Sequence, residues 1–450
     1  MPHSNSPAIP ADQRKGQAGS IRRVAAASLV GSALEWYDFF LYGTAAALVF
    51  NKLFFPGADP TIGTLAAFST FAVGFVARPI GGVIFGHFGD RVGRKAMLLI
   101  TLVIMGVSTT LIGVLPTYDQ IGILAPILLV AVRIVQGIAV GGEWGGAVLL
   151  ISEQSTRKRR GFYSAFSQTG VTLGYVISAA VFAIFGTLPQ DDFMSWGWRV
   201  PFLLSIVLVG VGLIIRTRIS ETPEFEKAKN SDEELPRLPV VQVLKEQWRS
   251  VLLVIGARMA ENGGSYVLLV FSLAYGTRIG LSTGLMLTAV ILANALETVT
   301  IVAFGALSDR IGRRPVYIMG AGGLILWAFP FFWLLNTKNP VLVCLAVVVA
   351  VSVCHAAMIG TQPSFFTELF TTKVRYSGLA LGHELSGVFA GGLAPFIATA
   401  LLAWQGSYWP VAVYLALLSV ITVVTVILAP EPTRPSRVRS RSGTAAAHGE

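Results

Sequence analysis

Charged side chains are scarce in this chain of 450 residues. Only 13% of the residues are Asp, Glu, Lys or Arg, whereas 54% are hydrophobic, and a soluble domain is usually about one-quarter charged. Stretches such as 96–118, 339–367 and 385–430 contain no charged residue at all. Each is long enough to cross a bilayer, which takes about 20 apolar residues. The composition therefore excludes a soluble protein and predicts an integral membrane protein.

Cysteine is nearly absent, and so are the usual signs of catalysis. Cys344 and Cys354 fall on one expected helix, about 15 Å apart along its axis, which is too far for a disulfide bond. No metal-ligand spacing, phosphate-binding loop or activated nucleophile stands out. We therefore predict no enzymatic activity, no catalytic residue, no metal site and no cofactor. The first twenty residues also lack the apolar core of a secretory signal, so we expect an uncleaved first span.

Hydropathy and turn signals together predict an all-α protein with twelve transmembrane helices. The expected ranges are 24–50, 62–87, 96–115, 121–152, 161–186, 197–216, 251–277, 283–307, 315–335, 340–368, 377–403 and 408–430.

Lysine and arginine fall almost entirely in alternate loops between these spans. The other loops hold only Lys52, Arg278 and Lys338. By the positive-inside rule, this asymmetry predicts a multi-pass protein of the plasma (inner) membrane with both termini in the cytoplasm. It also explains the net charge of +10 without a nucleic-acid partner.

The sequence divides into two similar halves. We expect a cytoplasmic tail at 1–23, a six-helix bundle at 24–216, a cytoplasmic linker at 217–250, a second six-helix bundle at 251–430 and a disordered cytoplasmic tail at 431–450. Repeated halves related by a pseudo-two-fold axis are typical of carriers, whose substrate site lies at the interface of the repeats. We expect such a carrier to work in the lipid bilayer as a monomer.

One loop motif occurs in both halves. Residues 86–95 read GHFGDRVGRK after the second span, and residues 305–314 read GALSDRIGRR after the eighth. An aspartate in such a loop can lie near a helix N-terminus, and its arginines can pair with an acidic residue after the fourth or tenth span. We predict that this network latches the cytoplasmic face, the alternative being a turn with positive-inside anchors only. The candidate gate residues are Gly86, Asp90, Arg91, Arg94, Glu153, Gly305, Asp309, Arg310, Arg313 and Glu368.

These loops resemble the signature of the major facilitator superfamily, whose fold has twelve spans in two bundles. The motifs at 35–39 (EWYDF), 133–137 (RIVQG), 196–202 (WGWRVPF) and 221–225 (ETPEF) are similar to those of its metabolite:proton symporter family. The resemblance implies proton-driven uptake of a small organic acid or zwitterion such as shikimate, α-ketoglutarate, citrate, proline or betaine. Residues 431–450 lack the heptads of the coiled coil found in osmosensing members, which argues against osmosensing.

Ionisable residues inside spans are costly and are functional candidates. Glu35 and Asp38 share a helical face, where burial and repulsion disfavour two charges, so one of them can exchange a proton. The alternative is a structural pair satisfied by neighbouring helices. In the superfamily, an arginine at the position of Arg133 is associated with proton transfer, although a buried structural ion pair is the alternative reading. The predicted proton-coupling residues are Glu35, Asp38, Arg133 and Glu143.

The candidate substrate-binding residues are Tyr37, Tyr42, Gln136, Arg258, Glu261 and Glu384. Aromatic residues of the first and seventh spans could contact a betaine-like cation, although packing between helices explains them equally well. Arg258 and Glu261 are three residues apart and could simply neutralise each other.

Three further polar residues allow more than one interpretation. Glu384 next to His383 presents the same choice between substrate binding and mutual pairing. Glu297 is either a second proton site or a partner of Arg258. We interpret His355, on an apolar helix, as a packed polar residue.

The leading hypothesis is a secondary active transporter that couples proton symport to uptake of a small carboxylate or zwitterion by alternating access, with protons and the small molecule as its partners. The alternative is a proton-coupled efflux antiporter of metabolites or drugs. Antiporters of the superfamily tend to carry a Gly-Pro pair in the fifth span, whereas residues 170–174 here read GVTLG. A transport-like receptor or a membrane enzyme is a minor alternative.

Overall fold

The computed structural model describes residues 29–56, 59–92, 94–141, 148, 155, 159–217, 239–371 and 375–430. All regular secondary structure among these residues is helical, with no strand. This agrees with a sequence of long apolar runs, because a backbone crossing a membrane must satisfy its own hydrogen bonds.

The first half contains spans one to six. Its first span is helical over 29–53 and ends in the π-helical turn η1 (Ala46–Phe50) and the short α2 (Asn51–Leu53). The other elements are α3 (Pro60–Val92), α4 (Arg94–Val114), α5 (Tyr118–Ile121), α6 (Leu124–Val140), α8 (Arg160–Phe185), α9 (Gln190–Ser195), η3 (Gly197–Arg199), α10 (Val200–Leu203) and α11 (Ser205–Thr217).

The second half contains spans seven to twelve, preceded by α13 (Pro239–Glu246). Its seventh span is a run of five elements, α14 (Trp248–Arg258), η4 (Met259–Gly263), α15 (Gly264–Tyr266), η5 (Val267–Phe271) and α16 (Ser272–Arg278). The remaining elements are α17 (Thr283–Ile311), α18 (Arg313–Asn336), α19 (Pro340–Val349), η6 (Ala350–His355), α20 (Ala356–Leu369), α21 (Arg375–Ser386), η7 (Gly387–Gly392), α22 (Ala394–Gln405) and α23 (Trp409–Leu428).

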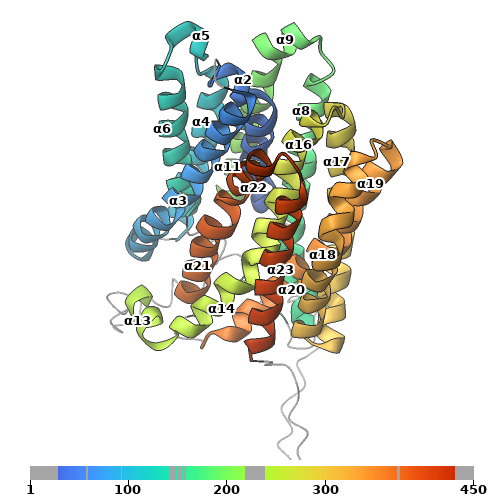
Figure 1. Cartoon of the computed structure of the whole chain (residues 1–450). Helices are drawn as coiled ribbons and strands as arrows, with labels where there is room; N and C mark the ends of the chain where they lie inside the picture. Colours follow the sequence, from blue (N-terminus) through green and yellow to red (C-terminus); the bar gives the residue numbers. More distant parts are fainter. Residues whose placement is uncertain are drawn as a thin grey trace, which may run out of the picture.

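Eight of the described helices are long and apolar enough to span a bilayer, and two shorter apolar helices, Leu99–Val114 and Leu124–Val140, lie beside them. With the first and seventh spans, which are interrupted by π-helical turns, they make the twelve transmembrane helices of two six-helix bundles. The predicted fold class is therefore confirmed. The short helices α5 and α9 lie at one end of the molecule, and α13 lies at the other (Figure 1).

Glycine allows close packing inside the first bundle. A Cβ atom on Gly137 of α6 would lie 2.2 Å from the carbonyl oxygen of Gly74 in α3, and one on Gly141 would lie 2.0 Å from the carbonyl oxygen of Arg78. Small residues at such crossings let helix backbones approach each other in a membrane, where packing drives association. The fourth span therefore holds Arg133 tightly against the second.

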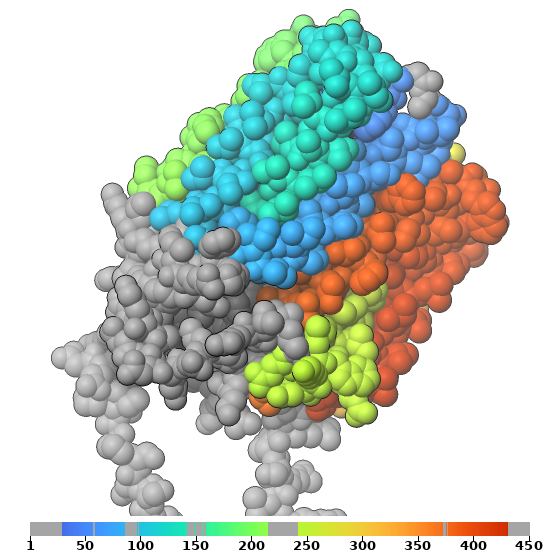
Figure 2. Space-filling view, turned by 90° about the vertical axis from the view of Figure 1, so that its left-hand side faces the viewer, coloured from blue at the N-terminus to red at the C-terminus, as the bar shows by residue number. Residues whose placement is uncertain are grey.

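The two bundles meet along their length. Helix α8 of the first bundle packs against α17 of the second, and α3 packs against α21 and α22. Figure 2 shows the second of these contacts, with α3 in blue lying along the orange α21 and α22. These contacts place the fifth and eighth spans, and the second and eleventh, at the interface between the bundles.

The segment predicted as a linker, 217–250, contains regular structure. Helix α13 lies within it and packs against α21, and the seventh span begins at Trp248 rather than at residue 251. The sequence of α13 is PVVQVLKE, which places apolar residues on one face and polar residues on the other. Residues 218–238 lie outside the described part of the chain.

Candidate functional site

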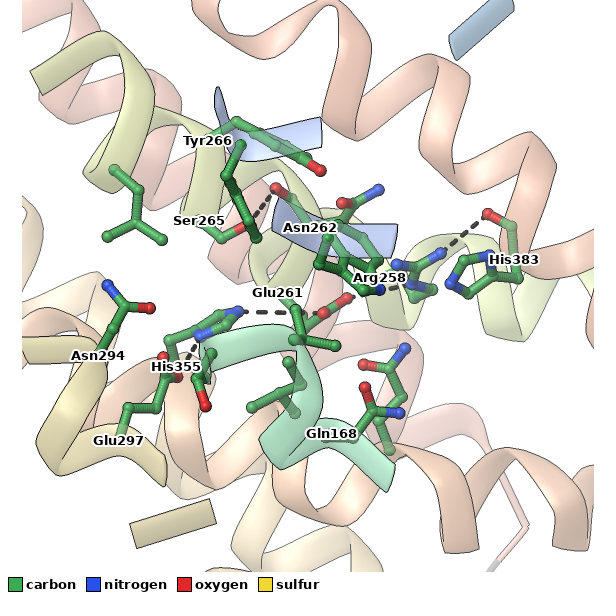
Figure 3. Close-up of a pocket in the computed structure, with 17 residues that line it drawn as sticks. Gln168, Arg258, Glu261, Asn262, Ser265, Tyr266, Asn294, Glu297, His355 and His383 are labelled. Atoms are coloured by element: carbon green, nitrogen blue, oxygen red, sulfur yellow. Dashed lines mark hydrogen bonds and ion pairs between the residues drawn. The ribbon is translucent and has the colours of Figure 1, made fainter. Parts of the chain in front are cut away.

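A buried polar cavity lies between the two bundles, near the middle of the seventh span (Figure 3). Its volume is about 30 Å³, which is room for one or two water molecules. The first bundle contributes Trp36, Phe40, Gln168, Val171 and Thr172 to its wall, and the second contributes Arg258, Glu261, Asn262, Ser265, Tyr266, Leu269, Asn294, Glu297, His355, Ile359, Gln362 and His383.

Two π-helical turns bring charged side chains to this cavity. Glu261 lies in η4 of the seventh span, and His355 is the last residue of η6 in the tenth. A widened turn of this kind shifts the direction of the side chains that follow it, and π-helical turns occur frequently at functional sites. The departure from regular α-helix therefore coincides with the most polar part of the interface.

Arg258 is held by three contacts within the second bundle. Its Nε donates to Glu261 Oε2 at 3.1 Å, and its Nη1 donates to the carbonyl oxygen of His383 at 2.8 Å and to Ser386 Oγ at 2.9 Å. Arg258 and Glu261 therefore pair, as their spacing suggested. Both also line the cavity, so pairing does not remove them from a binding role.

His355 lies between two carboxylates. Its Nδ1 is 2.5 Å from Glu297 Oε1 of α17, and its Nε2 is 3.9 Å from Glu261 Oε1 (Figure 3). The interpretation of His355 as an ordinary packed polar residue is therefore incomplete. Glu297 was interpreted as either a second proton site or a partner of Arg258. In the structure its side chain contacts His355 and not Arg258.

A second pair of the same type lies on the eleventh span. His383 Nδ1 is 3.0 Å from Glu384 Oε1. His383 lines the cavity, whereas Glu384 does not. Glu384, a predicted substrate-binding residue, therefore contacts a residue of the cavity wall but does not line the cavity itself.

Several buried polar atoms on the cavity wall have no hydrogen-bond partner within the described part of the chain. They are Gln168 Nε2, the Tyr266 hydroxyl, Glu297 Oε2 and His355 Nε2. These side chains are almost fully buried, and a buried polar group without a partner costs about 1–3 kcal/mol. Four such atoms around one cavity mark a place where a polar ligand would supply hydrogen bonds.

The predicted proton-coupling residues of the first bundle form a separate network. Ser205 Oγ donates to Asp38 Oδ1 at 2.7 Å, and the side chain of Thr109 also lies near Asp38. Gln136 Nε2 donates to Thr109 Oγ1 at 2.7 Å, and Arg133 Nη1 donates to Gln136 Oε1. A polar cluster therefore extends from the neighbourhood of Asp38 to Arg133.

The remaining candidates of the first bundle do not line the cavity. The Tyr37 hydroxyl donates to the Pro201 carbonyl oxygen at 2.8 Å, and the Tyr42 hydroxyl lies 2.6 Å from Thr70 Oγ1. Glu35 is buried but is also absent from the cavity wall. Glu143 lies outside the described residues.

Several aromatic rings that could have received a cationic ligand face arginines of the chain itself. The guanidinium carbon of Arg78 lies 4.3 Å from the centre of the Phe39 ring, and that of Arg133 lies 4.1 Å from the centre of the Tyr42 ring. Of the aromatic side chains, Trp36, Phe40 and Tyr266 reach the cavity.

The second copy of the loop motif connects the two bundles at the α13 end of the molecule. Asp309 accepts hydrogen bonds from the backbone nitrogens of Gly161 and Phe162, both at 2.9 Å. These residues open α8, so the carboxylate lies at a helix N-terminus, where negative charge is favoured. Arg313 Nη1 donates to Asp309 Oδ1 at 2.7 Å.

Glu368 extends this network to the tenth span. Its Oε1 lies 3.7 Å from Arg313 Nη2 and 3.8 Å from Arg160 Nη1 of the first bundle. Close approach is possible because a Cβ on Gly161 would lie 2.5 Å from the Gly305 carbonyl oxygen. Arg310 is exposed.

The first copy of the motif is less completely described. Gly86, Asp90 and Arg91 belong to the end of α3, and Arg94 begins α4, but their side chains lie outside the described part of the structure. Glu153 is likewise outside the described residues.

The cavity is also closed toward the α9 end. The Tyr175 hydroxyl of α8 donates to the Leu269 carbonyl oxygen of η5 at 2.9 Å. Leu269 lies about 12 Å beyond Glu261 along the seventh span. The Tyr266 ring also packs at 5.4 Å from both Phe71 and Phe75 of α3. Contacts between the bundles therefore lie on both sides of the cavity along its length.

Comparisons with known proteins identify the family. The model of the Major Facilitator Superfamily matches residues 28–383. The shikimate transporter of Escherichia coli (strain K12) is 43% identical over 417 residues, which cover 92% of this chain and 95% of the relative. The proline/betaine transporter of the same strain is 36% identical over 419 residues, covering 90% and 83%.

Solved structures show the same fold. The proton:xylose symporter XylE bound to 6-bromo-6-deoxy-D-glucose superposes with a TM-score of 0.74 at 17% identity, covering 92% of this chain and 97% of that one. The chain therefore belongs to the Major Facilitator Superfamily, in the branch that resembles metabolite:proton symporters, and is a multi-pass membrane transporter rather than an enzyme.

Proposed function

We propose that this protein is a proton-coupled symporter that takes up a small organic carboxylate or zwitterion by alternating access. The observation that carries the proposal is the polar cavity between the bundles, where buried polar atoms from both halves have no hydrogen-bond partner among the described residues. Relatives named as shikimate and proline/betaine transporters support this substrate class.

The chemistry of the cavity wall favours a substrate with a carboxylate and several further polar groups. Arg258 supplies a cation, which binds carboxylates well through its planar fork. Gln168, Asn262 and Asn294 supply amide donors and acceptors. Trp36 and Tyr266 offer apolar faces that suit a ring or a compact carbon skeleton.

The contacts on either side of the cavity suit two alternating gates. Breaking the Asp309 and Glu368 contacts would open the α13 end, while separating Tyr175 from Leu269 would open the α9 end. We further propose that the α13 end faces the cytoplasm in the plasma (inner) membrane, as the positive-inside pattern predicts, with Asp38 and Arg133 serving proton transfer.

Transport assays in proteoliposomes test the proposal. The purified protein would be supplied with radiolabelled shikimate, α-ketoglutarate, citrate, proline or glycine betaine, with and without an inwardly directed proton gradient. We expect accumulation of at least one compound only when the gradient is present. Accumulation of none would overturn uptake by symport, and release driven by an opposite gradient would instead favour efflux antiport.

A further inference from the structure

We propose that His355 and Glu297 form a second protonation site, on the cavity wall of the C-terminal bundle, which takes up a proton together with an anionic substrate. This proposal rests on the function proposed above. It takes up one of the two sequence-based interpretations of Glu297, a second proton site, and adds His355 as its partner.

The first step of the argument is geometry. His355 Nδ1 and Glu297 Oε1 are 2.5 Å apart, which is closer than the separation of about 2.7–2.9 Å usual for a charge-assisted N–H···O hydrogen bond. The other carboxylate oxygen, Glu297 Oε2, has no partner among the described residues, and Glu297 lines the cavity. Glu297 is only 1% exposed. The pair thus shares one hydrogen bond and leaves one carboxylate oxygen of a cavity-lining residue free to bind a proton.

The second step is the charge of the surroundings. The charged and titratable side chains on the cavity wall around the pair are Arg258, Glu261 and Tyr266 on the seventh span and His383 on the eleventh. Tyr317 packs behind them, and its hydroxyl donates to the Ala257 carbonyl oxygen at 3.1 Å. Arg258 and Glu261 neutralise each other. One proton shared by His355 and Glu297 neutralises that pair as well. Arg258, Glu261, Glu297 and His355 together are therefore neutral, with Glu384 a further carboxylate beside His383 and off the cavity wall.

An anionic substrate changes this balance. A monoanion entering beside Arg258 adds one negative charge to a volume walled by buried side chains, where a net charge is expensive. A second proton on Glu297 Oε2 restores neutrality and supplies a donor to the substrate. The proton comes from the compartment to which the cavity is open, and it leaves with the substrate on the other side. This gives a physical reason for proton and anion to bind together.

Substitutions on the purified full-length protein test the site. In Glu297→Gln, the side chain keeps its shape but cannot take up a proton. We expect shikimate accumulation driven by a proton gradient to fall by about tenfold or more, while exchange of labelled for unlabelled shikimate at equal pH remains. His355→Gln should show the same separation of the two activities.

A matched control removes a hydrogen bond between the same two helices without touching a titratable group. Ser352 Oγ donates to the Ala293 carbonyl oxygen at 2.7 Å, so Ser352→Ala loosens the packing of η6 against α17. We expect accumulation and exchange to remain coupled in this variant. An equal loss of coupling in Ser352→Ala would assign the effect to packing and overturn the proposal.

A substrate-free measurement separates this proposal from the proposed function. Infrared difference spectroscopy of the protein in lipid, titrated with acid, detects the carbonyl band of a protonated carboxyl group. We expect one band to disappear in Glu297→Gln and to shift in His355→Gln. If shikimate were not transported at all but this band behaved as expected, the protonation site would stand and the substrate assignment would fail. Identical spectra for the wild type and Glu297→Gln would overturn the proposal that Glu297 binds a proton.

Discussion

Asp38 and Arg133 show how a single buried carboxylate can be tied to a distant cation. No direct ion pair joins them in the described contacts; Thr109 lies near Asp38, and its hydroxyl oxygen accepts from Gln136, which in turn accepts from Arg133. In a buried polar cluster of this kind, a change of charge at one group affects the orientation of its neighbours. Protonation of Asp38 would therefore be felt at Arg133, next to the rings of Phe39 and Tyr42.

Replacement of Asp38 tests its part in coupling. Asp38→Asn keeps a hydrogen-bond acceptor for Ser205 but cannot cycle a proton. We expect accumulation of shikimate under a proton gradient to fall by about tenfold or more, with exchange at equal pH preserved. Ser205→Ala is the control, because it removes a neighbour of the carboxylate without removing the carboxylate itself. Equal loss of accumulation and exchange in Asp38→Asn would argue for a purely structural role.

Sequence spacing predicted contacts along one helix better than contacts between helices. Arg258 and Glu261 are three residues apart, so their pairing follows from helical periodicity. His355 and Glu297 belong to different spans, and their contact depends on the crossing of α17 with η6. Nothing in the local sequence around His355 sets that crossing, which explains why His355 looked like a packed residue. The useful signal was the presence of several ionisable residues in otherwise apolar spans.

At the level of whole elements, the start of α8 is the point at which the bundles are most directly joined. Two backbone nitrogens of α8 point at one carboxylate of α17. Hydrogen bonds to a charged group contribute about 1.5–3 kcal/mol each. The energy of this contact is therefore large enough to shift an equilibrium between an open and a closed end.

Loss of the Asp309 charge should favour the state that is open at the α13 end. In Asp309→Asn we expect the open population to rise by about tenfold, since two charge-assisted hydrogen bonds and the ion pair with Arg313 are weakened. Distances between spin labels on α8 and α17 measure this population. Arg310→Gln serves as a comparison within the same motif, because Arg310 is exposed. An unchanged distance distribution in Asp309→Asn would show that the Asp309 contacts do not hold the α13 end closed.

Steric bulk at the same crossing should act in the same direction. A Cβ on Gly161 would lie 2.5 Å from the Gly305 carbonyl oxygen, so Gly161→Ala pushes α8 and α17 apart. We expect slower exchange of shikimate and a greater reactivity of engineered cysteines inside the α13 end. Gly322→Ala is the matched control, since a Cβ there meets nothing within 4 Å. If engineered cysteines at the α13 end of Gly161→Ala reacted no faster than in the parent protein, α8 and α17 would be able to accommodate the added methyl group without opening that end.

The apolar pattern predicted the spans well and the small helices poorly. The predicted spans 283–307 and 340–368 correspond to α17 and to α19 through α20, because long apolar runs have few alternatives in a membrane. Helices α9 and α13 were not predicted. Both are short, α9 is mostly polar and α13 is amphipathic, and such short helices owe their stability to packing against neighbours rather than to their own sequence.

Considered as a whole, the molecule buries more acid than base in its membrane interior. The buried basic residues within the described spans are Arg78, Arg133, Arg258 and Arg313, and the buried acidic residues are Glu35, Asp38, Glu261, Glu297 and Glu384. With neutral histidines, carboxylates exceed guanidiniums by one, and the excess lies in the second bundle because the first holds two of each. Because uncompensated charge in the membrane is costly, this excess favours a bound proton in the second bundle.

The size of the cavity adds a second constraint on the whole molecule. A cavity with room for one or two water molecules cannot hold any of the candidate metabolites. Under the proposed function, binding therefore requires the bundles to move apart, as rocking of one repeat against the other allows. The arrangement described here would then suit the step in which the carrier reorients without its substrate.

Charge balance across the cycle leads to a prediction about stoichiometry. If the closed cavity is neutral both with and without substrate, each negative charge on the substrate moves with one proton, and uptake of a monoanion is electrically silent. We expect a proton gradient to drive shikimate accumulation, whereas a membrane potential set by potassium and valinomycin at equal pH should not. Citrate at a pH where it carries more charge should require proportionally more protons. Accumulation of shikimate driven by potential alone would mean that a net charge crosses with it, and that the buried carboxylates bind more protons than neutrality demands.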